Sequence, residues 1–191
     1  MKKVQKICLV AGICLLAVAA AVLITWQWGI HSAREKAAYY VQSIQALTPQ
    51  AQSAVPEPRN DNAMPVLSID GTDFAGVLEM PRFDSALPVG AEWRKVAKYP
   101  CLFDGSAYDS TLQIGASSQA GQYDFYRDIS VGDSVFFTDM AGNRFSYQIT
   151  DIRYEKHADQ ATLQKADADL TLFIQNIYAF EYIVISCDIS K

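Results

Sequence analysis

Histidine is scarce in this chain of 191 residues: His31 and His157 are the only two. Zinc sites built from several histidine ligands are therefore excluded. The four cysteines show no Cys-x-x-Cys spacing, so the sequence carries no motif typical of a structural metal or a redox pair. We expect no cofactor and no metal on these grounds. No internal repeat is visible.

Positive charge is in short supply beyond the N-terminus. Residues 1–28 hold three lysines and no acidic residue, whereas residues 29–191 hold 13 basic and 21 acidic residues. A nucleic-acid partner needs a clustered positive field, so the acidic main body argues against one. Half of the residues are hydrophobic, which supplies a core and excludes disorder throughout the chain.

A long uncharged run predicts a membrane anchor. The 19 residues from Ile7 to Thr25 reach roughly 28 Å as a helix, close to the hydrocarbon thickness of a bilayer. Lysines precede the run, and Trp26 and Trp28 follow it. This pattern predicts a single-pass protein of the cell membrane with a cytoplasmic N-terminus and an extracellular main domain. A cleaved signal peptide is the rival interpretation, since Ala17-Val18-Ala19 resembles a cleavage site, but the apolar run continues well past it.

Three parts are expected along the chain. Residues 1–28 form a cytoplasmic tip and transmembrane anchor, residues 29–65 a stalk, and residues 66–191 the folded domain. Within the stalk, apolar residues recur at three- and four-residue steps from Ser32 to Leu47, which predicts a helix. A proline-rich linker then runs to Pro65 and would hold the domain away from the bilayer.

The folded domain has the pattern of an all-β protein. Residues 144–153 alternate apolar and polar side chains, and the turn cluster Asp139–Asn143 joins them to Val135–Thr138 as a hairpin. Many short strands and few helices predict a closed or nearly closed β-barrel. Further strands are expected at Phe74–Met80, Thr111–Gly115, Leu170–Ile174 and Tyr182–Ile185, and helical pieces near Tyr123–Ile129 and Gln160–Lys165.

The order of several motifs resembles the sortases, the membrane-anchored cysteine transpeptidases of Gram-positive bacteria that attach proteins to the cell wall or polymerise pilins. The resemblance covers about 115 residues, in the right order and spacing, and the layout of anchor and stalk agrees with it. It implies an all-β, sortase-like closed barrel of about eight strands with one or two short helices, and a role in the cell envelope. The matching segments are Phe74–Pro81 with Leu87–Val89, Tyr99–Cys101 with Gly105–Ala107, Ile114–Ala116, Phe125 with Val131–Asp133, Leu170–Gln175 and Glu181–Ile185.

The same resemblance implies that the catalytic residues are missing. Sortase chemistry needs a cysteine thiolate, a histidine that moves a proton and an arginine that stabilises the oxyanion. The matching positions hold Gln175, Ala116 and Glu181 respectively. Glutamine cannot form an acyl-enzyme, alanine cannot move a proton, and glutamate repels an oxyanion. The sequence therefore predicts a degenerate sortase, with no catalytic residue at these positions.

Other residues offer weaker alternatives. The only enzymatic alternative that specific residues support is a catalytic dyad of Cys101 and His157 at positions other than the family's. Cys101 is expected in a loop near the peptide groove. Cys187 alternates in step with Ile183, Ile185 and Ile189 on one face of the predicted strand, so we expect a thiol buried in the core. A disulfide between Cys101 and Cys187 is permitted outside the cell. Loop acids offer carboxylates for calcium, but their spacing is not that of an EF-hand, so solvated acids are the default: Asp104, Asp109, Asp124, Asp128 and Asp133.

Three functional hypotheses follow. The first is a pseudo-sortase that binds a peptide tail or a cell-envelope protein as an accessory in cell-wall anchoring or pilus assembly. The second is an active transpeptidase or peptidase that uses displaced residues. The third is a purely structural surface domain without a peptide ligand.

Overall fold

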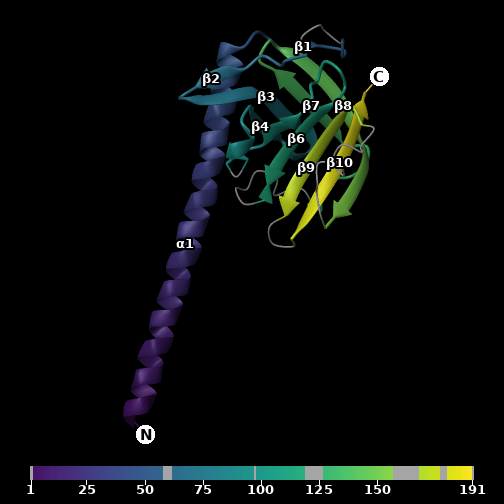
Figure 1. Ribbon diagram of the computed structural model, residues 1–191. Helices are drawn as coiled ribbons and strands as arrows, with labels where there is room; N and C mark the ends of the chain where they lie inside the picture. Colours follow the sequence, from purple (N-terminus) through teal and green to yellow (C-terminus); the bar gives the residue numbers. More distant parts are fainter. Residues whose placement is uncertain are drawn as a thin grey trace.

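One long helix and a barrel of strands lie side by side in the computed structural model (Figure 1), which describes residues 2–57, 62–96, 98–118, 127–156, 168–176 and 180–190. The helix is α1 (Lys2–Leu47), and two 3-10 turns are η1 (Pro81–Phe83) and η2 (Trp93–Lys95). The strands are β1 (Gln52–Ser53), β2 (Leu67–Ile69), β3 (Thr72–Met80), β4 (Ser85–Gly90), β5 (Cys101–Asp104), β6 (Leu112–Ser117), β7 (Ser134–Asp139), β8 (Asn143–Glu155), β9 (Leu170–Asn176) and β10 (Glu181–Ile189).

Eight of the ten strands in the described residues close into a ring. Going round the ring, the order is β3, β4, β5, β6, β9, β10, β8 and β7, and β7 pairs with β3 to complete it. Strands β1 and β2 are additions that pair with β8 and β3. Closure leaves no free edge in the ring, which is how a closed barrel protects its backbone hydrogen bonds. The closed barrel predicted from the sequence is confirmed.

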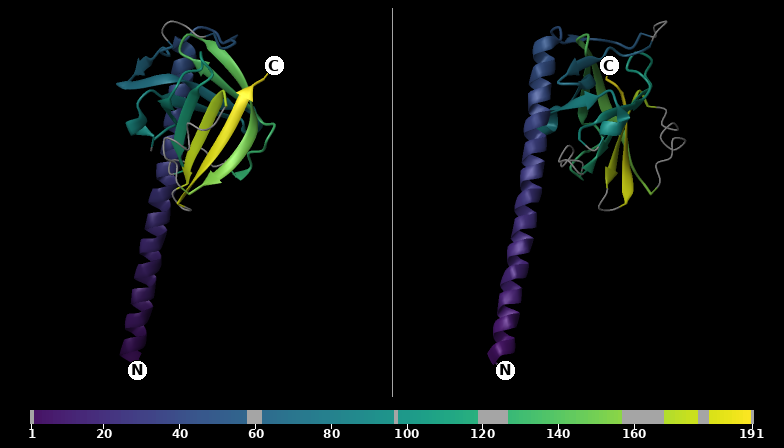
Figure 2. Two further views of the ribbon diagram at one scale, coloured as in Figure 1. Left: turned by 45° about the vertical axis from the view of Figure 1, so that its right-hand side comes forward. Right: turned by 60° about the vertical axis from the view of Figure 1, so that its left-hand side comes forward.

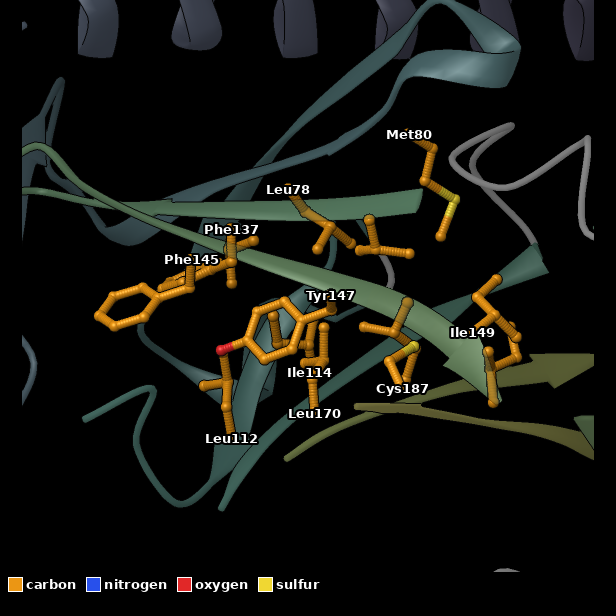
Figure 3. Packing of buried hydrophobic residues seen from close by; sticks show 14 of the residues in the cluster. Leu78, Met80, Leu112, Ile114, Phe137, Phe145, Tyr147, Ile149, Leu170 and Cys187 are labelled. Carbon is orange, nitrogen blue, oxygen red and sulfur yellow. The ribbon is translucent and has the colours of Figure 1, made fainter. Parts of the chain in front are cut away.

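Apolar side chains fill the inside of the ring because every strand alternates between its two faces. On β8, the inward residues Phe145, Tyr147 and Ile149 are buried, and the same alternation predicts this strand from the sequence. Figure 3 shows Tyr147 and Ile149 lying among side chains of other strands, Cys187 among them. Each fully buried aliphatic side chain contributes roughly 1.5–3 kcal/mol, so this core is the main source of stability.

A buried carboxylate fixes the turn between β7 and β8. Asp139 is 1% exposed. Its Oδ1 accepts the backbone N–H groups of Ala141 and Asn143, and its Oδ2 accepts the Tyr108 hydroxyl at 2.5 Å and the Asn143 side-chain amide at 2.8 Å. A buried charge is tolerated only when its oxygens are satisfied in this way. The turn residues were predicted; the role of Asp139 was not.

Helix α1 packs on the barrel instead of leading to a detached domain. Val41 and Ile44 are buried against a second apolar cluster on the outer face of the barrel, which includes Phe74 and Tyr99. After the helix, strand β1 pairs with β8. Figure 2 shows the barrel beside the C-terminal half of the helix in both views. The apolar stripe of the predicted stalk helix therefore finds its partner on the barrel itself.

The N-terminal part of α1 has the character of a membrane span. Its segment Ala11–Leu47 contains a window with mean hydropathy 2.0, and none of that window is buried against the rest of the described chain. By length and composition, α1 is thus able to cross a membrane. The expected helical pieces near Tyr123–Ile129 and Gln160–Lys165 fall largely outside the described residues.

Closure of the ring at β3 and β7 leaves no room for a side chain at Gly76. A Cβ there would lie 2.5 Å from the Phe137 ring and 2.6 Å from the Thr138 carbonyl oxygen. We predict that Gly76→Ala lowers the free energy of unfolding by about 1–3 kcal/mol, because the Thr138 backbone cannot yield without breaking the pairing. Thermal unfolding of the full chain in detergent measures this. Ser134→Ala, at an exposed position of β7, is the control and should change stability by less than about 0.5 kcal/mol. An unchanged melting temperature for Gly76→Ala would contradict this closure.

Candidate functional site

The site lies on the outer face of the barrel, where β6, β9 and β10 end or begin. The parallel pairing of β6 with β9 places Ser117 beside Gln175, and the antiparallel pairing of β9 with β10 places Tyr182 on the other side of Gln175. Registered neighbours in a sheet point to the same face. Ser117, Gln175 and Tyr182 therefore form one row across three strands.

Gln175 is the exposed member of this row. Its Nε2 donates to the Tyr182 hydroxyl oxygen at 3.4 Å, the long end of hydrogen-bonding distance. Ser117 is 4% exposed, so its hydroxyl lies beneath the surface. The amide of Gln175 is thus held weakly on one side only, and its remaining donor and acceptor capacity faces outward.

Ala116 and Glu181 do not share this face. Ala116 pairs with Ile174 and belongs to the core inside the barrel. Glu181 pairs with Asn176, whose Nδ2 donates to Glu181 Oε1 at 3.4 Å. Strand alternation puts Asn176 and Glu181 on the side opposite to Gln175. Of the three positions singled out in the sequence, only Gln175 lies on the outer face.

An aromatic cluster adjoins the row on the same outer face. The ring centroids of Trp93, Phe103 and Phe173 lie 4.9 to 5.5 Å apart. Val184 packs against Phe103 and Phe173. Gly115 makes room for this cluster, since a Cβ there would lie 2.5 Å from both Phe173 and Trp93. Trp93 remains 40% exposed, so an apolar ring borders the row that contains Gln175.

Both thiols of the barrel are buried. Cys101 lies in strand β5, not in the loop expected from the sequence, and Cys187 lies in β10; each is 0% exposed and neither is bonded to the other. Burial raises the pKa of the Cys101 thiol to about 12, and burial with the nearby Asp188 carboxylate raises the pKa of Cys187 above its usual range. The prediction that Cys187 is a core thiol is confirmed. A neutral, buried thiol is a poor nucleophile.

The remaining candidates lie elsewhere or outside the described residues. His157 and Asp124 lie outside them, so the geometry of a Cys101–His157 dyad is untested. Asp133 accepts the Arg82 guanidinium at 2.8 Å and the Ser130 backbone N–H at 2.9 Å. Within the described ranges, no three side chains of His, Cys, Asp or Glu gather as a metal site.

Comparisons with known proteins identify the fold of the barrel. No protein-family model and no curated protein matches the chain. Solved structures do match: sortase C1 of Streptococcus agalactiae has 19% identity and a TM-score of 0.52, with 65% of this chain and 71% of that chain covered. Sortase C-3 of Streptococcus pneumoniae has 16% identity and a TM-score of 0.51, over 86% and 84%.

A third match is Clostridium perfringens sortase C, solved with the C-terminal cell wall sorting motif. It has 18% identity and a TM-score of 0.51, with 62% and 71% of the two chains covered. The chain therefore has the sortase fold, as its motif order predicted, and the solved structures it is similar to include class C sortases.

Sequence reasoning missed Ser117, Tyr182 and Trp93. Gln175 was found because the run Leu170–Gln175 resembles a sortase strand. Its neighbours depend on the register between β6 and β9. Between Ser117 and Leu170 lie 52 residues, and no local sequence signal determines how two strands so far apart pair. Trp93 lies in η2, between strands, where hydrophobic periodicity gives no information.

Burial predicts that the barrel thiols resist alkylation. In a chain carrying Cys8→Ser and Cys14→Ser, we expect iodoacetamide at pH 8 to label Cys101 roughly a thousandfold more slowly than an exposed cysteine, because its pKa of about 12 leaves so little thiolate, and to label Cys187 slowly for the same reason. Intact-mass measurements over time give the rates. A denatured sample is the control and should take up two labels quickly. Rapid single labelling of the folded chain would show that one thiol is activated.

Proposed function

We propose that this protein is a membrane-anchored, extracytoplasmic pseudo-sortase: a sortase barrel without sortase catalysis that binds a peptide tail or partner protein in cell-wall anchoring or pilus assembly. One observation carries the proposal. Gln175, at the position where the sortase resemblance requires the catalytic cysteine, is exposed on the outer face between Ser117 and Tyr182. A carboxamide in that place binds but does not form a thioester.

The surroundings of Gln175 support the loss of catalysis. Ala116, at the family's histidine position, packs inside the barrel and has no proton to move. Glu181, at the family's arginine position, lies on the side of the sheet opposite to Gln175 and offers no positive charge to an oxyanion. The alternative of a displaced transpeptidase needs Cys101 as nucleophile, and its burial at 0% exposure speaks against that role.

The same surroundings support binding. A partly exposed tryptophan beside an exposed carboxamide offers an apolar anchor and a backbone partner, the combination that peptide-binding surfaces use. The similar sortase C of Clostridium perfringens was solved with a sorting motif, so the fold accommodates such a motif in that protein. The acidic main body favours a basic ligand over an acidic one.

The membrane anchor sets where the ligand is met. Lysines on the N-terminal side of the apolar run and tryptophans after it support a cytoplasmic N-terminus and an external barrel. Strand β9 ends and β10 begins at the end of the barrel that lies nearer to the N-terminus of α1 (Figure 1). The site consequently lies at the barrel end nearer to the membrane, and the ligand is a segment that lies close to the outer membrane surface.

A fluorescence titration tests the proposal. Trp93 is the only tryptophan outside α1, so in a Trp26→Phe, Trp28→Phe chain its emission reports the site alone. We expect basic extended peptides, with sequences taken from the membrane-proximal tails of envelope proteins, to change this emission with a Kd on the order of micromolar or weaker. Gln175→Ala should weaken binding roughly fivefold through one lost hydrogen bond.

Two further variants make the result specific. Glu181→Arg should shift the preference toward acidic peptides only slightly, because Glu181 lies on the side of the sheet opposite to Gln175 and acts through the overall charge alone. Ser146→Ala on β8, away from the site, should bind as the parent does. If no peptide changes the Trp93 emission in any variant, the surface binds no tail and the purely structural domain is the better account.

A further inference from the structure

A cavity of about 350 Å³ lies between α1 and the barrel, away from Gln175. The helix contributes Gly29, Ser32 and Lys36, and the barrel side contributes Thr72, Lys95 and Lys98. Small-ligand sites in proteins begin at roughly this volume. The cavity is therefore large enough for a compact polar group.

The charge of this cavity is opposite to that of its surroundings. Three lysines line it and no acidic residue does, although residues 29–191 hold 21 acidic and only 13 basic residues. Lys95 has one ion-pair partner, Glu92 at 3.5 Å, and the nearer partner of that carboxylate is Arg94 at 2.9 Å. Within the described chain, Lys36 and Lys98 form no ion pair. Three lysines around one cavity repel one another unless an anion lies between them.

The position of the cavity along α1, relative to the predicted membrane span, indicates where the anion comes from. Gly29, at its lower end, directly follows Trp28, which marks the outer interface of the predicted span. Lys36 lies eight residues further along the helix, about 12 Å above Trp28. Because Lys95 and Lys98 line the same cavity, the barrel holds them within this layer. Lipid phosphates occupy the layer just outside the hydrocarbon core.

We propose that this cavity binds the phosphate headgroup of an anionic phospholipid from the outer leaflet. The lipid fixes the barrel against the membrane in which α1 is anchored, and with it the direction in which the Gln175 face points. The inference rests on the external, membrane-anchored placement in the proposed function, but not on peptide binding or on the loss of catalysis.

Lipid retention by the full chain tests the proposal. The chain is reconstituted with phosphatidylcholine and phosphatidylglycerol, and native mass spectrometry measures which lipid remains bound. We expect one preferentially retained phosphatidylglycerol. A lysine near an anionic surface contributes roughly a fivefold gain in affinity, so Lys98→Gln should lower this preference about fivefold, and Lys36→Gln, Lys95→Gln and Lys98→Gln together about a hundredfold.

Matched variants separate the cavity from general charge. Replacing the same three lysines by arginine keeps the charge and should preserve the preference within about twofold. Arg82→Gln removes one positive charge from η1, where Arg82 pairs with Asp133 and does not line the cavity, and should change nothing. An unchanged preference in the triple glutamine variant overturns the proposal. So does displacement of the lipid by millimolar inorganic phosphate, which would make this a site for the free anion.

Flotation of the chain with vesicles of phosphatidylcholine alone is a separate measurement. It tests membrane association through α1 and not lipid binding in the cavity. Flotation without a preference for phosphatidylglycerol contradicts the cavity proposal and leaves the proposed function intact. Failure to float contradicts the anchor, and both proposals fall with it.

Discussion

The pairing of β7 with both β3 and β8 is the constraint on which the rest of the structure depends. It turns an open sheet into a ring, and the ring encloses the apolar core. Gly76 allows the close approach of β3 to β7, and the four hydrogen bonds to the Asp139 carboxylate fix the turn that returns the chain along β8. Without closure, neither face of the sheet would have a fixed partner.

Closure also determines what the outer face presents. Because the inside of the ring is full, side chains of opposite parity on β6, β9 and β10 form a second surface, which holds the Trp93 cluster and, next to it, the row of Ser117, Gln175 and Tyr182. Another part of the outer face receives Val41 and Ile44 of α1. The same ring thus holds the candidate binding surface and the helix that is long and apolar enough to cross a membrane.

Features that depend on short stretches of sequence could be predicted, whereas features that depend on contacts between distant segments could not. Alternation of Phe145, Tyr147 and Ile149 identified β8, and the order of short motifs identified the sortase fold. Three features escaped because they depend on contacts between distant segments. These are the neighbours of Gln175, the burial of Cys101 in a strand, and the docking of the stalk helix, whose apolar stripe was visible although its partner was not.

The central claim is that a sortase fold persists here without sortase chemistry, and intact-mass spectrometry tests it most directly. The full chain is incubated with a sorting-signal peptide and an amine acceptor, beside an active sortase C as the positive control. Our account predicts an unchanged protein mass and an uncleaved peptide, because Gln175 cannot accept an acyl group and both barrel thiols are buried. A thioester on Cys101 or Cys187, or a transpeptidation product, would contradict it.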